Sequence, residues 1–195
     1  YCAAAETGYE QLAHQSSDIF SPVIEKDEEG NKKITSKATT DDWIKLGMAA
    51  IKFGDLINHP TKDYIFDLDK FLSAEGKTGI YLLYSISRIN SMLKKAGEQK
   101  REFNGVYSES ERDLMLKLVE SGDAFVGAFN ELAPNYVCEN AYQLAVAFSR
   151  FYHDNRILDE QDGAKRANWL ALCELVRDQL CRHLNILGIT PVENM

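Results

Sequence analysis

The sequence predicts an all-α protein built as a helical bundle, and three observations support this prediction. Apolar residues recur every three or four positions over several long stretches, which is the period of an amphipathic helix. The four prolines among the 195 residues stand mostly near the ends of those stretches, where they interrupt no helix. Apolar residues make up 45% of the chain, which is enough for a core in one domain, or in one domain with an appendage.

The first forty residues differ in character from the rest. Residues 1–15 have a short helical pattern, and residues 16–40 hold a charged run around Gly30 between β-branched residues. This second part is either an exposed linker or a small β-hairpin that turns at Glu28–Asn31. We therefore expect residues 1–40 to form an N-terminal helix followed by a linker or hairpin, and residues 41–195 to form the helical bundle.

Two helices and a tight loop are expected in the next part of the chain. The first helix begins at Thr40 or Asp41, either of which can cap it, and ends near Asn58–Pro60, because proline disfavours helix in the residue before it. A second helix is expected from Asp63 to about Leu72. It leads into a loop over Ser73–Gly79.

A long helix is expected from Ile80 to Ala96, since its apolar residues keep a helical period. The helix after it should run from Glu109 to about Glu120, because Ser108 and Glu111 have the spacing of a capping box. Ser121–Asp123 contains a glycine and should break or kink this helix before a short helical piece over residues 124–132.

Two more helices complete the predicted bundle. Pro134 suits the first residue of one of them. Its expected core residues are Val137, Ala141, Leu144, Phe148 and Phe151. The last helix begins near Asp162 and ends at Gly188. Its expected core residues are Trp169, Leu172, Val176, Leu180, Leu184 and Leu187.

The charge of the chain is unevenly distributed. A net charge of −8 argues against indiscriminate binding to nucleic acid. The stretch from Lys77 to Arg101 nevertheless holds six basic residues and a single acidic one, Glu98. Such a basic strip is either a solvated helix face or a local contact for structured RNA. The six basic residues are Lys77, Arg88, Lys94, Lys95, Lys100 and Arg101.

Cysteine spacing and hydropathy bear on the compartment. The four cysteines show neither metal-binding nor disulfide spacing, which is typical of reduced thiols in a cytoplasmic protein. No apolar run has the length of a membrane span, and no signal peptide is visible. We therefore expect a cytoplasmic protein without a membrane partner.

Tyr81, Tyr84 and Arg88 share one face of a predicted helix, because residues three and four apart lie together. Two flat rings beside a guanidinium group can stack unpaired bases and bind phosphate. A structural interpretation competes with this one. The tyrosines would pack on the core with their hydroxyls at its rim, and Arg88 would pair with Asp67 or Glu75.

No constellation typical of an active site occurs in the sequence. Tyr152, His153 and Asp154 include an acid and a base, but adjacent residues on a helix point apart. The sequence has neither a phosphate-binding glycine loop nor a hydrolase or metalloprotease motif. We therefore expect no catalytic residue, no metal site and no cofactor in this chain itself.

Three blocks of the sequence resemble the C-terminal, anticodon-binding region of class I arginyl-tRNA synthetases. They stand in the order and at the spacing of that family. The first block is residues 46–56, the second is residues 61–89, and the third is residues 170–195. The second block contains Tyr64-Ile65-Phe66-Asp67, a glutamate–glycine loop and the two tyrosines three apart, and the third ends in ILGITPVENM.

This resemblance implies a DALR-type anticodon-binding domain in which the loop Ser73–Thr78 approaches the anticodon arm. Arginine anticodons all have cytosine at the centre, and binding it needs stacking and edge hydrogen bonds. The loop departs from the family at Ala74, where phenylalanine is usual, and at Lys77, where asparagine is usual, so that Lys77 would contact a phosphate. By motif match, the residues expected to contact tRNA are Lys77, Tyr81, Tyr84, Arg88, Tyr152 and Met195.

The resemblance also implies a longer parent enzyme, which charges tRNA with arginine using ATP and Mg²⁺. The motifs of its nucleotide-binding domain are missing here, so residues 1–40 would join the bundle to that catalytic domain. The piece itself would be a non-catalytic monomer that binds the anticodon stem-loop of tRNA(Arg), but not DNA. The alternative is a stand-alone helical interaction module that kept the fold and lost RNA binding, with an exposed apolar patch in place of the tyrosine–arginine pocket.

Overall fold

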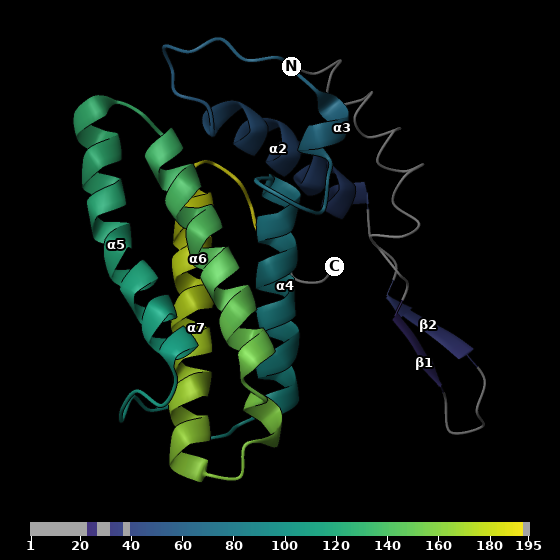
Figure 1. The fold of residues 1–195 in the computed structure, drawn as a ribbon. Helices are drawn as coiled ribbons and strands as arrows, with labels where there is room; N and C mark the ends of the chain where they lie inside the picture. The colour runs from purple at the N-terminus through teal and green to yellow at the C-terminus, as the bar shows by residue number, and fades with distance from the viewer. Residues whose placement is uncertain (1–22, 27–31, 37–39, 193–195) are drawn as a thin grey trace.

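The computed structural model of the chain describes residues 23–26, 32–36 and 40–192, and these form a helical bundle with one small hairpin (Figure 1). The all-α prediction is thereby confirmed. Four long helices lie side by side, and another crosses one end of them. The long helices are α4 (Gly79–Ala96), α5 (Glu109–Glu131), α6 (Asn135–Asp154) and α7 (Gly163–Ile186), and the crossing helix is α2 (Thr40–Leu56).

The core lies between these helices and contains the apolar stripes that the sequence predicted. All five core residues expected in α6 are buried, and so are the six expected in and just after α7. In α4 the buried apolar side chains also follow the predicted period. They are Ile80, Leu82, Leu83, Ile86, Ile89, Met92 and Leu93, with Ala96 in the last turn.

A close backbone contact fixes the start of α4. Gly79 packs against α2 so tightly that a Cβ atom there would lie 2.3 Å from the carbonyl oxygen of Ala49. Only glycine allows this approach. Thr78 caps the helix, since its hydroxyl accepts a hydrogen bond from the Tyr81 N–H at 3.1 Å. The loop before α4 is therefore held at the crossing of α2 and α4.

A two-stranded hairpin precedes the bundle. Strands β1 (Val23–Lys26) and β2 (Lys32–Ser36) pair antiparallel, with Ile24 opposite Ile34. Of the two interpretations of residues 16–40, these strands agree with the hairpin. The expected turn at Glu28–Asn31 and the expected helix over residues 1–15 lie outside the described residues, and the division into residues 1–40 and 41–195 stays a prediction.

The helix predicted from Asp63 to Leu72 is mostly wrong, because only α3 (Leu68–Phe71) is helical. Asp67 is extended and caps this short helix, accepting a hydrogen bond from the Lys70 N–H at 3.2 Å. Ahead of it, the Tyr64 hydroxyl donates to the Asp55 carboxylate at 2.7 Å. These side-chain contacts hold residues 63–67 outside a helix.

The predicted break in α5 is also wrong, since the helix runs without interruption through Ser121–Asp123. Ser121 is buried against the bundle, and the position of Gly122 is open, so neither residue disturbs the packing. Glycine within a helix costs about 1 kcal/mol relative to alanine, which the packing of a long helix outweighs. The short 3₁₀ helix η1 (Ile157–Asp159) was not predicted.

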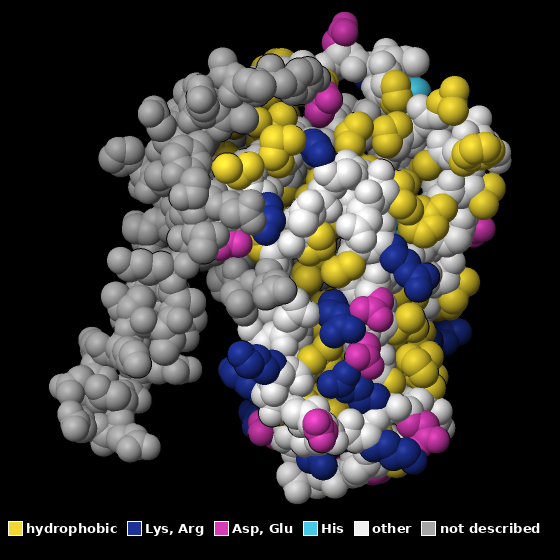
Figure 2. All heavy atoms as spheres, turned by 180° about the vertical axis from the view of Figure 1, so that it is seen from behind, with side chains coloured by type: hydrophobic (Ala, Val, Ile, Leu, Met, Phe, Trp, Pro, Cys, Tyr) yellow, Lys and Arg dark blue, Asp and Glu magenta, His cyan; other side chains and the backbone are white. Residues whose placement is uncertain are grey.

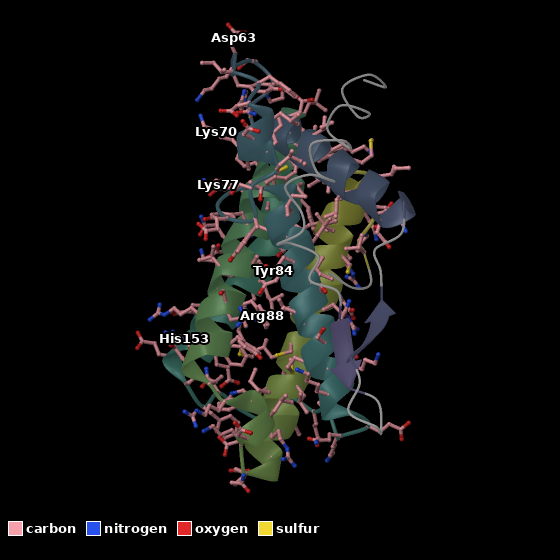
Figure 3. The ribbon with its side chains drawn as sticks, turned by 90° about the vertical axis from the view of Figure 1, so that its right-hand side faces the viewer. Asp63, Lys70, Lys77, Tyr84, Arg88 and His153 are labelled. Carbon is pink, nitrogen blue, oxygen red and sulfur yellow. The ribbon has the colours of Figure 1, made fainter. Side chains whose placement is uncertain are left out.

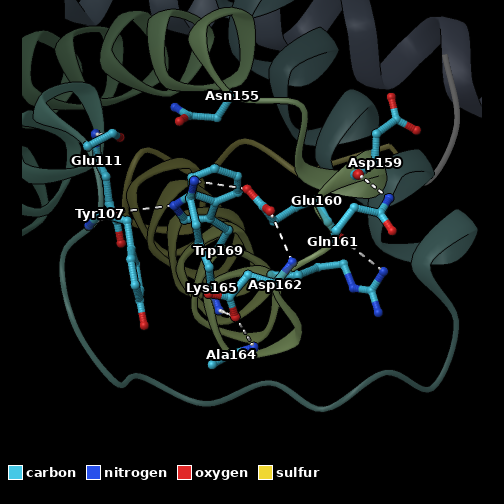
Figure 4. A network of polar contacts seen from close by, with 12 residues as sticks. Tyr107, Glu111, Asn155, Asp159, Glu160, Gln161, Asp162, Ala164, Lys165 and Trp169 are labelled. Carbon is cyan, nitrogen blue, oxygen red and sulfur yellow. Dashed lines mark hydrogen bonds and ion pairs between the residues drawn. The ribbon is translucent and has the colours of Figure 1, made fainter.

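A buried carboxylate joins the beginnings of α5 and α7 (Figure 4). Glu111 has no exposed surface and accepts hydrogen bonds from the Tyr107 N–H at 2.7 Å and from the Trp169 indole N–H at 3.0 Å. The Asn168 side-chain amide donates a further bond. Ser108 caps α5 as predicted, accepting from the Glu111 N–H at 3.2 Å. This network fixes the end of the bundle opposite α2.

Candidate nucleic-acid interface

Helices α4 and α6 run in the same direction, and side-chain contacts join them along their length (Figures 1 and 3). We call this surface the α4–α6 face. The contacts pair Lys77 with Glu139, Tyr81 with Tyr142, and Arg88 with Tyr152. Figure 3 shows Lys77, Tyr84 and Arg88 one after another along the same side of the molecule. The α4–α6 face consists of these seven residues: Lys77, Tyr81, Tyr84, Arg88, Glu139, Tyr142 and Tyr152.

Arg88 lies on an aromatic ring of the neighbouring helix. Its guanidinium carbon is 4.3 Å from the centre of the Tyr152 ring, which is the geometry of a cation–π contact. No ion pair joins Arg88 to Asp67 or Glu75, and Asp67 instead pairs with Lys70 at 3.2 Å. The pairing of Arg88 with Asp67 or Glu75, which the sequence left open, is therefore wrong.

The two tyrosines of α4 differ in exposure. Tyr84 is exposed, with 47% of its surface open to solvent, so its ring is accessible to a base. Tyr81 is half-buried and packs on Tyr142, with the ring centres 5.8 Å apart. Burial raises the pKa of Tyr81 above its ordinary value, and the neighbouring Tyr142 contributes to the rise. Tyr81 therefore remains a neutral hydroxyl at physiological pH, able to donate a hydrogen bond.

Lys77 extends from the loop before α4 to α6. Its Nζ atom lies 2.7 Å from Glu139 Oε2 and 5.6 Å from the centre of the Tyr142 ring. Both side chains of the ion pair are about half exposed. Lys77 is therefore at the surface, as predicted, but its charge is already matched by a carboxylate.

The structure brings most of the predicted residues together. Tyr81, Tyr84, Arg88 and Tyr152 lie along the α4–α6 face, and Lys77 lies at its end nearest α2. Met195 lies outside the described residues. Their contact with RNA stays a prediction.

Sequence reasoning missed Tyr142 and Glu139, both on α6. A signal for Tyr142 was present, because Tyr142, Ser149 and Tyr152 recur at intervals of seven and three residues, which return to one side of a helix. The Ser85 hydroxyl also donates to the Tyr81 carbonyl oxygen at 2.8 Å. For Glu139 no such signal existed, since its partner Lys77 is 62 positions away.

The predicted basic strip is partly neutralised. Arg101 pairs with Glu174 at 2.5 Å, and Lys100 pairs with Glu102. Figure 2 shows Lys and Arg side chains interleaved with Asp and Glu over the lower half of the face opposite that of Figure 1. Lys94 and Lys95 are exposed in the last turn of α4. The positive charge of the strip that can bind phosphates is therefore confined to a few side chains, such as Lys94 and Lys95.

A shallow hollow of about 280 Å³ adjoins the Tyr152 ring. Residues of η1 and of the segment before it form its walls, namely Asn155, Arg156, Ile157, Leu158 and Asp159.

Within the described ranges, no helix combines the length and the apolar character of a membrane-crossing segment.

Comparison with known proteins identifies the family of the chain. Residues 82–195 match the family described as "DALR anticodon binding domain". The chain is 43% identical over 169 residues to an arginine–tRNA ligase from Alkaliphilus oremlandii, covering 85% of this chain and 29% of that protein. It is 45% identical over 153 residues to one from Hyphomonas neptunium, covering 77% of this chain and 26% of that protein. The chain thus spans less than a third of the length of these relatives.

Two solved structures share the fold. The arginyl-tRNA synthetase of Thermus thermophilus superposes with a TM-score of 0.85 at 23% identity, over 99% of this chain and 32% of that one. The Plasmodium falciparum arginyl-tRNA synthetase gives a TM-score of 0.74 at 24% identity, over the same shares. Because the family match takes in more than half of the chain, from α4 to its last residue, the chain belongs to the DALR anticodon binding domain family.

Proposed function

We propose that this chain is the anticodon-binding part of an arginine–tRNA ligase and that it binds the anticodon stem-loop of tRNA(Arg) on the α4–α6 face. The observation that supports this most directly is the cluster of Tyr84, Arg88 and Tyr152. It offers an exposed ring, a cation and a second ring at the meeting of two helices. Rings and guanidinium planes are the groups on which proteins stack unpaired bases.

Each residue of the cluster has a separate role in this proposal. Tyr84 stacks on an unpaired base with its exposed ring. Tyr152 holds the guanidinium group of Arg88 in place. The N–H groups of Arg88 can therefore donate hydrogen bonds to a phosphate or to the edge of a base. Lys77 contacts a phosphate, and Met195 adds backbone groups at the end of the chain. The central cytosine would be bound between these groups.

The wider activity is proposed from the relatives, which are named arginine–tRNA ligases. In this proposal the parent attaches arginine to tRNA in the cytoplasm, and the remainder of the parent binds ATP and Mg²⁺. This chain supplies no catalytic group, needs no cofactor, and acts as a monomer joined to its own catalytic domain. Its contribution is to select the tRNA.

A protein-interaction module remains the second candidate, since α5 has an exposed apolar stripe. Val119, Val126 and Phe129 are 76%, 60% and 79% exposed. Helix α5 lies on the opposite side of the bundle from α4 (Figure 1), so this stripe does not replace the tyrosine–arginine cluster. That placement favours RNA binding over the alternative.

The test compares an arginine anticodon stem-loop with the same stem-loop in which the central C is changed to G. Affinity of the 195-residue chain is measured for both across a series of salt concentrations. We expect at least a tenfold preference for C, or about 1.4 kcal/mol. Equal binding that fades with salt would contradict base recognition, because a purely electrostatic contact carries no sequence information.

A further inference from the structure

A hollow of about 350 Å³ adjoins the end of the α4–α6 face nearest α2, and we call it the α3 hollow. Lys77 belongs to both surfaces, because it lines the hollow and also contacts Tyr142 on α6. Figure 3 shows Lys70, Lys77 and Tyr84 one after another along one side of the molecule. RNA that lies on the α4–α6 face therefore has the α3 hollow within reach. Residues that line the hollow include Asn58, Tyr64, Phe71, Ser73, Glu75 and Thr78.

Two rings held in place form part of this lining. Phe71 and Tyr64 have their ring centres 6.3 Å apart. The Phe71 ring lies against α2 at Gly54, where a Cβ atom would come within 2.5 Å of it. The Tyr64 ring is held by its hydroxyl, which donates to Asp55 at 2.7 Å. Tyr64 is 39% exposed, so part of this aromatic surface is open to a base.

Two hydrogen-bond acceptors that line the hollow receive no hydrogen bond from any described residue. The Asn58 side-chain amide donates to the Gly54 carbonyl oxygen at 2.7 Å, but in the described part of the chain nothing donates to its Oδ1 atom. The Glu75 carboxylate likewise has neither an ion pair nor a hydrogen bond within the described ranges. An ionised carboxylate can only accept. The hollow therefore suits a ligand that presents N–H groups at the edge of a flat ring.

The loop that carries Glu75 has a defined shape. The Thr78 hydroxyl donates to the Ser73 carbonyl oxygen at 2.7 Å and so joins the two ends of the loop. The Glu75 N–H donates to the Ser73 hydroxyl at 3.1 Å, and between Glu75 and Thr78 the chain turns at Gly76 with a φ of +81°, which glycine adopts readily. Binding at Glu75 therefore does not have to order a mobile loop first.

We propose that the α3 hollow is a second base-binding site of this RNA-binding surface and that it binds an unpaired guanine through the Glu75 carboxylate. This inference rests on the proposed function. Guanine suits the site because its N1–H and N2–H groups lie side by side, so that the two oxygens of one carboxylate can accept both. Its flat ring meets the aromatic lining of the hollow.

A guanine is available in the expected RNA. Most arginine codons begin with cytosine, so the base on the 3′ side of the central cytosine in their anticodons is guanine. Gly79 at the start of α4 lies about 8 Å from Tyr84 along the helix axis, at 1.5 Å per residue. A short step along an unstacked strand spans that distance. The two bases can therefore occupy the α4–α6 face and the α3 hollow together.

The test on the protein is the variant Glu75→Gln, which keeps the shape of the side chain and leaves one carboxylate oxygen in place of two. Affinity is measured for an arginine anticodon stem-loop with guanine after the central cytosine. We expect binding to weaken by at least about fivefold, as for the loss of a bidentate contact to a base. The direction is informative, because removing a negative charge reduces the repulsion of RNA and would by itself tighten binding.

The RNA is changed in parallel. Inosine in place of this guanine removes the 2-amino group, and adenine puts an acceptor at N1. Each should weaken binding to the unmodified chain by about threefold or more, because one or both donors to the carboxylate are lost. With Glu75→Gln, guanine and inosine should bind within about twofold of each other, since the two changes remove the same contact.

The matched control is Asp69→Asn on α3. Asp69 is exposed and does not line the hollow, and the substitution changes net charge equally. It should not weaken binding, and the difference between guanine and inosine should persist. Thermal unfolding of both variants shows whether the fold is retained.

The outcomes separate the two proposals. If the unmodified chain shows no preference for central C over G, the proposed function fails before any variant is made. If that preference is present but guanine, inosine and adenine bind equally after the central base, the α3 hollow holds no guanine and the inference is wrong. Unchanged or tighter binding by Glu75→Gln would equally overturn it. A loss of guanine preference in Glu75→Gln, with the preference for central C retained, is the result that the inference requires.

Discussion

The guanidinium carbon of Arg88 lies 4.3 Å above the centre of the Tyr152 ring, so a cation on α4 is oriented by an aromatic ring on α6. Neither residue is fully buried. The contact therefore has a modest effect on stability. It also holds the arginine in position at the surface.

The coupling between these two residues can be measured. In a double-mutant cycle of Arg88→Ala and Tyr152→Leu, we expect a coupling free energy of about 0.5–1 kcal/mol, as for a cation–π contact at an exposed site. Urea unfolding of the four proteins gives this value. A coupling free energy near zero would mean that the two side chains are adjacent without interacting.

Tyr84→Ala should weaken anticodon-arm binding by at least ~1 kcal/mol, as for the loss of one stacked base. Because Tyr84 is exposed, the far-UV circular dichroism spectrum should stay unchanged. Tyr107→Ala is a suitable control, since Tyr107 is an exposed tyrosine in the connection before α5 whose hydroxyl donates to Asn104 at 2.7 Å. Equal losses in the two variants would remove the special role of Tyr84.

The Lys94→Ala substitution should weaken binding to both stem-loops, with central C or G, to a similar degree. Lys94 is exposed near the end of α4, where we expect it to contact phosphate rather than bases. The slope of log K against log salt should become shallower by about 0.7–0.9. Lys100, which already pairs with Glu102, should have a smaller effect when changed to alanine. A loss confined to the C-containing stem-loop would contradict this assignment.

Stability should fall as the pH drops from 7 to 5, because of His183. The ring has no exposed surface, and its nitrogens lie 2.7 Å from Asn140 Oδ1 and 2.7 Å from the Gln179 carbonyl oxygen. Burial lowers the pKa of His183 below its ordinary 6.5 in the folded protein. Below pH 6.5 the unfolded chain therefore binds more protons than the folded one, and the free energy of unfolding decreases.

Urea unfolding of the chain at pH 7, 6 and 5 measures this effect. The His183→Gln variant should be less pH-dependent over that range. His153→Gln should behave like the unmodified chain, because His153 is exposed. An unchanged slope in His183→Gln would assign the pH dependence to other groups.

The long helices could be predicted from sequence because their signals are local. Ile80, Leu83 and Ile86 repeat at helical spacing, and Asp162 stands where a cap is needed; its carboxylate accepts from the Ala164 N–H at 2.9 Å. The course of residues 63–67 could not be predicted. It depends on Tyr64 reaching Asp55, a contact that appears only once α2 is in place.

The candidate site divides in the same way. Tyr81, Tyr84 and Arg88 stand together in sequence and could be selected by spacing alone. Tyr142 and Glu139 belong to another helix, and only the packing of α6 beside α4 makes them partners of Tyr81 and Lys77. Pairings across helices follow from packing rather than from sequence patterns, which is why the competing interpretation of Arg88 named a carboxylate partner and not Tyr152.

Because α4 and α6 run side by side in one direction, their contacts form a fixed register. Adding one residue between Tyr84 and Arg88 would turn everything beyond it by about 100° around the axis of α4 and would carry the guanidinium group away from Tyr152. A deletion in α6 would have the same effect from the other side. Changes of chain length in this domain should therefore be confined to the connections between helices, such as residues 97–107, while the two paired helices keep their lengths.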